Sequence, residues 1–152
     1  METFTHTAEI LKHLKNLHRQ LREHYDQGRS QVNRERARML FGEAQRQQEE
    51  ILAAVVRFQQ QTTADEIKAH FQYTPKALDR PPFDLEALRP DMTTDEAARL
   101  IAGHLSAMIK VYGRLGEMSA NSKVAEVFRS LEQQLRAMRD RLAHSSQQMK
   151  DI

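Results

Sequence analysis

Apolar residues recur at spacings of three and four along most of the chain, and this spacing predicts amphipathic helices. The first predicted helix covers residues 8–26. Gly28 is the expected residue just after its end, because glycine adopts the left-handed conformation of a helix terminus at low cost. Ser30 or Asn33 would then cap the next helix. The apolar face of the first helix contains Ile10, Leu14, Leu17, Leu21 and Tyr25.

The second predicted helix, residues 34–60, carries a break in its apolar stripe. In the segment EAQRQQEEIL, residues 43–52, Gln47 and Gln48 occupy positions where the stripe should continue. The apolar positions on either side of them are Ala37, Leu40, Phe41, Ala44, Ile51, Val55 and Phe58. Two glutamines on a core-facing stripe need a physical reason.

Two capping boxes mark further helix starts. Thr63-Ala-Asp-Glu66 predicts a short helix over about 64–71, and Thr93-Thr-Asp-Glu96 predicts a helix over 94–118. A turn at Ser119-Ala-Asn-Ser122 then leads into a last helix over 122–149. The inward positions of these two long helices are Ala97, Ile101, His104, Met108, Val111 and Leu115, then Val124, Phe128, Leu131, Leu135, Met138 and Leu142.

All four prolines lie in one connection, residues 72–93, between the second and third long helices. The other two connections are short, so each predicts an antiparallel helical hairpin. Helices of this length measure about 30–40 Å, and an extended crossover could run along the whole bundle. The predicted fold is a single all-α domain, residues 1–152: an antiparallel four-helix bundle of the ferritin-like type. A plain up-down-up-down bundle with an elaborate middle loop is the alternative.

The composition argues against several classes of function. The 152 residues carry 23 basic and 21 acidic side chains, a formal charge of +2, so nucleic-acid binding is not expected. The chain has no cysteine, which excludes disulfides, thiolate nucleophiles and thiolate metal sites. Because no apolar run reaches membrane-spanning or signal-peptide length, we expect a cytoplasmic protein with no membrane contact.

Bundles with two iron ions place Glu-x-x-His pairs in their cores, since residues three apart share one helix face. None of the seven histidines has an acidic residue three positions before it. The chain therefore has no Glu-x-x-His motif.

Two helices nevertheless resemble rubrerythrin-type ferritin-like proteins. The resemblance is carried by residues 36–58, RARMLFGEAQRQQEEILAAVVRF, and by VAEVFRSLEQQLRAMRDRL, residues 124–142. In that alignment, Gln48 and Ile51 occupy the glutamate and histidine positions of the first Glu-x-x-His motif of the family. Leu135 and Met138 occupy the same two positions of the second motif. The resemblance implies the fold, while its departures fall on the iron ligands, so iron oxidation and peroxide reduction do not carry over.

The neutral residues at these ligand positions have a common physical explanation, the loss of the metal. Buried carboxylates without a metal cost several kcal/mol each, whereas glutamine can be satisfied by neutral hydrogen bonds. We therefore expect no metal, cofactor or catalytic residue. The candidates for a vestigial site in the core are Gln47, Gln48, Ile51, His104, Leu135 and Met138. The first helix offers only Leu and Ile on its inner stripe. His104 is read as a core histidine bonded to Gln47 or Gln48, or else as a residual ligand facing them.

Two other features of the sequence are weaker indications of a binding site. Glu9 with His13, and Glu66 with His70, have the spacing of an adventitious surface metal site. Arginines near the start of the second helix could bind phosphate or the acidic segment 84–96, but an ordinary solvated face is favoured. They are Arg29, Arg34, Arg36 and Arg38.

The predicted function is a non-catalytic interaction or scaffold protein. It is expected to form a homodimer through apolar residues left outside the main stripes, namely Leu11, Leu52, Val56, Leu105 and Tyr112. The alternative is a metal-binding redox or iron-handling protein with unusual ligands, which would bring in iron or manganese. Nucleic-acid binding through the arginines is a third, weaker option.

Overall fold

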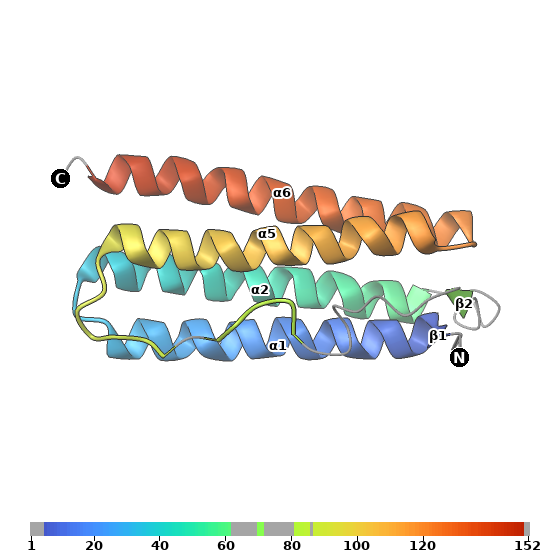
Figure 1. The fold of residues 1–152 in the computed structure, drawn as a ribbon, viewed down its shortest axis with the longest axis horizontal. Helices are drawn as coiled ribbons and strands as arrows, with labels where there is room; N and C mark the ends of the chain where they lie inside the picture. The colour runs from blue at the N-terminus through green and yellow to red at the C-terminus, as the bar shows by residue number, and fades with distance from the viewer. Residues whose placement is uncertain (1–4, 62–69, 72–80, 86, 151–152) are drawn as a thin grey trace.

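Helices make up most of the residues that the computed structural model describes, which are 5–61, 70–71, 81–85 and 87–150 (Figure 1). Within these residues there are four helices: α1 (Thr7–Gln31), α2 (Glu35–Gln61), α5 (Thr94–Met118) and α6 (Ser122–Lys150). A two-residue strand β1 (Thr5–His6) pairs antiparallel with β2 (His70–Phe71). The predicted all-α fold of four long helices is confirmed.

The helices associate in two closely packed pairs. Contacts are dense between α1 and α2 and between α5 and α6, and sparser from α2 to α5 and α6. The turns within the pairs are short, at residues 32–34 and 119–121. The backbone N–H of Asn33 donates to the carbonyl of Pro90 over 2.8 Å. The chain just before α5 therefore meets the turn between α1 and α2, at one end of the bundle (Figure 1).

Local capping decides where the second pair begins. The Thr93 side chain accepts from the N–H of Glu96, and the Glu96 side chain accepts from the N–H of Thr93, which is the predicted capping box. The helix over 94–118 is confirmed at both ends. The start of α6 is capped by Asn121, whose side chain accepts from the N–H of Val124 over 3.1 Å. These interactions satisfy amide groups that have no partner within the helix.

The predicted end of the first helix was wrong. α1 continues through Gly28 to Gln31, and Gly28 has no positive φ. Gly28 instead lies against the ring of Phe41 in α2: a Cβ atom at this position would come within 2.8 Å of it. The glycine allows close packing of α1 on α2 and does not end the helix.

The predicted short helix over 64–71 falls partly outside the described residues, and its last two residues form β2, not helix. Residues 72–80 and 86 of the predicted crossover also lie outside them. Residues 81–85 and 87–92, which we call the strap, pass along α1 (Figure 1) and line pockets against both α1 and α5. Phe83 and Met92 anchor the strap in the core, where their side chains are 9% and 7% exposed.

The apolar residues assigned to a dimer surface lie inside the bundle. Leu11, Leu52, Leu105 and Tyr112 are buried, and Val56 is half-buried. A helix in a four-helix bundle packs against two neighbours, so its buried face is wider than one stripe. That assignment was wrong. No helix formed by the described residues is long and apolar enough to cross a lipid bilayer.

Candidate functional site

Polar side chains are buried at the centre of the bundle, where burial is costly unless they are hydrogen-bonded. Among the described residues they come from α1, α2 and α5 and form two clusters, plus single residues at the edges. The full set is Thr7, His18, His24, Gln47, Gln48 and His104.

The first cluster is a hydrogen-bonded chain of three residues from three helices. His18 Nδ1 lies 2.7 Å from Gln48 Oε1, and His18 Nε2 lies 2.8 Å from the Tyr112 hydroxyl. An amide oxygen only accepts, so Nδ1 carries the proton. Nε2 of the neutral ring then accepts from Tyr112. Every polar atom of the imidazole is satisfied without a charge.

Burial keeps this chain neutral. It lowers the pKa of His18 to about 4, and the hydrogen bond to Gln48 offsets the shift only in part. Burial also raises the pKa of the Tyr112 hydroxyl. Neither group ionises near pH 7. The chain therefore links α1, α2 and α5 structurally and presents neither an acid nor a base poised for proton transfer.

The second cluster lies one to two turns further along α1. The Tyr25 hydroxyl is 2.8 Å from His104 Nδ1, and the two rings stack with centroids 5.7 Å apart. His24 meets the edge of His104 at a centroid distance of 5.9 Å. Phe83 of the strap covers the His104 ring at 5.4 Å. Two buried imidazoles from α1 and α5, which we call the histidine pair, thus lie together beneath the strap.

His104 is held neutral by its surroundings. Burial is the main cause that lowers its pKa to about 4, followed by the charge of nearby His24, while the Asp84 backbone partly offsets both. His104 is 3% exposed, and its Nε2 atom makes no hydrogen bond of ordinary geometry with any described residue. The Tyr25 pKa is raised by burial.

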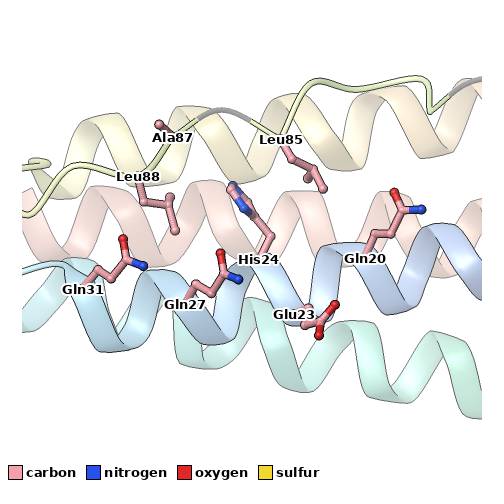
Figure 2. Close-up of a pocket in the computed structure, with 8 residues that line it drawn as sticks. All are labelled: Gln20, Glu23, His24, Gln27, Gln31, Leu85, Ala87 and Leu88. Carbon is pink, nitrogen blue, oxygen red and sulfur yellow. The ribbon is translucent and has the colours of Figure 1, made fainter.

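Two pockets flank the strap and reach the histidine pair from opposite sides. One, of about 420 Å³, lies between α1 and the strap, with His24 projecting between Leu85 and Leu88 (Figure 2). Gln20, Glu23, Gln27 and Gln31 complete its α1 wall. The other, of about 550 Å³, lies between α5 and the strap and contains His104, Gly103 and Phe83. Each pocket is therefore lined by one imidazole of the pair.

Gln47 and Gln48 have different surroundings. Gln48 points to His18, whereas Gln47 lines a third pocket, of about 460 Å³, between α2 and α6. Leu40, Ala44 and Leu142 form the apolar part of this pocket, and Asp140 and Arg141 also line it. The two glutamines therefore do not form one polar layer.

The other candidates for a vestigial site are dispersed in the core. Ile51, Leu135 and Met138 are each 0% exposed and belong to the hydrophobic cluster. The expectation that His104 faces Gln47 or Gln48 was wrong, because its hydrogen bond goes to Tyr25. Within the part of the chain that the structure describes, no group of three His, Cys, Asp or Glu side chains is arranged to hold a metal ion.

His18 and His24 were missed because only one stripe of α1 was considered. Leu11, His18 and Tyr25 are seven residues apart, as are Ile10, Leu17 and His24. A spacing of seven places residues on the same helix face. Because these two rows of residues lie side by side on one face of the helix, taking both as core-facing would have predicted His18 and His24 in the core.

The remaining sequence candidates do not converge. Glu9 and His13 are exposed, and Glu66 lies outside the described residues. Arg29 pairs with Asp26 over 3.9 Å. In the acidic segment, Arg89 pairs with Asp91 and Glu96, so these acids are neutralised within the segment itself.

Comparison with known proteins gives no assignment. No family model matches the sequence, and no significant match was found among curated proteins or solved structures. Function must therefore be argued from the residues themselves.

Proposed function

We propose that this protein is a non-catalytic, ferritin-like helical bundle that acts as an interaction or scaffold protein and has no di-iron centre. The observation that carries the proposal is the neutral chain from Gln48 to His18 and Tyr112. It occupies the α2 position at which the resemblance to rubrerythrin-type proteins implies a carboxylate ligand. A bundle that binds two iron ions needs several carboxylates around that point.

The ferritin-like arrangement is supported by the hydrogen bond between Asn33 and Pro90. It brings the starts of α2 and α5 to the same end of the bundle, so these helices run in the same direction (Figure 1). Two hairpins arranged in this way need a connection that returns along the bundle, which is the role proposed for the proline-rich crossover. An up-down-up-down bundle would place the start of α5 at the end of α2 instead.

A homodimer remains part of the proposal, with a different surface. The large hydrophobic side chains exposed among the described residues are Met39, at 56%, and Leu85, at 42%. Met39 lies near the start of α2 between Arg38 and Leu40 and is our candidate for the contact. Sedimentation velocity over a hundredfold concentration range tests this, with Met39→Lys as the variant expected to remain monomeric. A wild-type chain that is monomeric throughout would refute the homodimer.

The absence of a di-iron centre has its own test. Elemental analysis of freshly purified protein should give far less than one iron or manganese per chain. Protein that contains no metal as purified should have a thermal unfolding midpoint unchanged by a chelator, because only bound ligands stabilise the fold by mass action. Two ions per chain, together with a chelator-sensitive midpoint, would overturn the proposal.

A second candidate function is a metal-binding protein with unusual ligands, which would handle iron or manganese or use them in redox chemistry. It is favoured by one observation, the histidine pair in contact beneath the strap. Imidazole nitrogens are good ligands for transition metals. This candidate needs a metal in the purified protein that is lost when either histidine is replaced.

A further inference from the structure

The histidine pair has the separation of two imidazoles that share one metal ion. Ion-to-nitrogen distances are about 2.0–2.1 Å, which puts each ring centre roughly 3.2 Å from the ion and two ring centres about 5 to 6.4 Å apart. The His24 and His104 centroids are 5.9 Å apart, with an angle of 66° between the planes.

Tyr25 orients one of the two rings. Its hydroxyl holds His104 Nδ1, so Nε2 is the atom left for coordination. Metal-binding histidines commonly have the other ring nitrogen hydrogen-bonded in this way, which fixes the direction of the ring. Nε2 of His104 is buried and makes no hydrogen bond of ordinary geometry with a described residue, although the Asp84 backbone is close enough to raise the pKa of the ring. A buried polar atom of this kind calls for an explanation, and a bound ion is one.

Pockets adjoin the pair on both sides of the strap, although Nε2 of each ring is itself buried. His24 opens to the pocket on the α1 side of the strap, and His104 opens to the pocket on the α5 side. Glu23 adds negative charge to the pocket on the α1 side, whereas Asp84 and Glu96 in the pocket on the α5 side are balanced by Arg89 and Arg99. The ring of Phe83 shields the His104 ring from above.

We propose that His24 and His104 form a two-histidine binding site for a single divalent transition-metal ion, with water in the remaining coordination positions and the strap as its cover. Nitrogen ligands without thiolates select zinc, copper, nickel or cobalt over magnesium and calcium. The site differs from the lost di-iron centre in its residues and its nuclearity. It deepens the second candidate function but does not depend on redox chemistry.

The test starts from metal-free, full-length protein titrated with Zn²⁺ and Ni²⁺ alone. We expect one ion per chain at this site, with affinity reduced at least tenfold in His24→Gln and in His104→Gln. His13→Gln, which removes an exposed histidine of α1, is the matched control and should bind as the wild type does. Equal binding by all four proteins, or loss of binding in the control alone, would overturn the proposal.

Two measurements do not depend on the folding of the histidine variants. Tyr25→Phe keeps the ring and removes the positioning hydroxyl, and should weaken Zn²⁺ binding about 10- to 100-fold. Imidazole ¹⁵N spectra of the wild type should show Zn²⁺ shifting a nitrogen of both His24 and His104, while His18 is unaffected. Shifts confined to exposed histidines would refute the site.

The outcomes separate this inference from the proposed functions. Stoichiometric Zn²⁺ binding that requires both histidines, in a protein purified without iron or manganese, supports the site and leaves the non-catalytic proposal intact. Iron bound at full stoichiometry in His24→Gln and His104→Gln would reject the non-catalytic proposal, whereas Zn²⁺ affinity unchanged in these two variants would reject the site alone.

Discussion

The imidazole of His18 donates from Nδ1 to Oε1 of Gln48 over 2.7 Å, and this bond joins α1 to α2 inside the bundle. It explains why a glutamine stands on the apolar stripe of α2. The glutamine is the neutral acceptor for a buried histidine. A carboxylate at the same position would bring a charge into the core and favour a protonated His18.

Gln48→Leu should destabilise the fold by about 1–3 kcal/mol, because the His18 N–H is left buried without an acceptor. Adding His18→Leu should restore part of this loss, since two apolar side chains can replace a buried polar pair at little cost. Urea unfolding of the single and double variants measures the coupling. Gln60→Leu, at an exposed position of the same helix, is the control. Fully additive losses would contradict the pairing.

Stability should fall as the pH is lowered from about 6.5 to about 4. The pKa of His18 in the fold is about 4, below its ordinary value of 6.5. Between these values the unfolded chain binds a proton that folded His18 does not, so acid favours unfolding. Above pH 6.5 His18 causes no loss of stability, because it is neutral in both the folded and the unfolded chain. Below pH 4 the loss of unfolding free energy that it causes reaches about 3 kcal/mol.

The difference between wild type and the His18→Leu/Gln48→Leu variant isolates the contribution of His18 to this pH dependence. Unfolding free energies at pH 7, 5.5 and 4 should fall more steeply for the wild type. Parallel curves for the two proteins would show that His18 is not held neutral by burial.

Gly28→Ala should destabilise the protein by about 1–3 kcal/mol, because the new methyl group would overlap the buried ring of Phe41. Gly103→Ala is its counterpart in α5. No atom lies within 4 Å of a Cβ at that position. There alanine should stabilise the helix by about 0.5–1 kcal/mol. Thermal unfolding of both variants compares them directly, and equal shifts of the same sign would refute this packing.

Thr93→Ala should cost about 1 kcal/mol by removing the cap of α5. Thr94→Ala, one residue further on, keeps the capping box and serves as the control. The thermal unfolding midpoints of the two variants should differ by about 2–4 °C. If both alanine variants unfold at the same temperature, the capping box contributes nothing measurable to stability.

The predictable parts of this protein are those decided by neighbouring residues. The start of α5 followed from Thr93 and Glu96, because a capping box acts within one helical turn. The four long helices followed from apolar periodicity. Gly28 shows where local reasoning fails: its signal for a helix end was overridden by packing against Phe41, a residue of another helix.

The sequence by itself determined the helices, most of their ends and the absence of a Glu-x-x-His motif, because these depend on spacing along one chain. Only the tertiary structure decided which buried groups meet. It paired Gln48 with His18 and His104 with Tyr25, and it brought His24 beside His104 beneath the strap. The physical reason is that a buried polar atom takes its partner from the facing helix, and which residues face each other depends on the rotation and offset of whole helices.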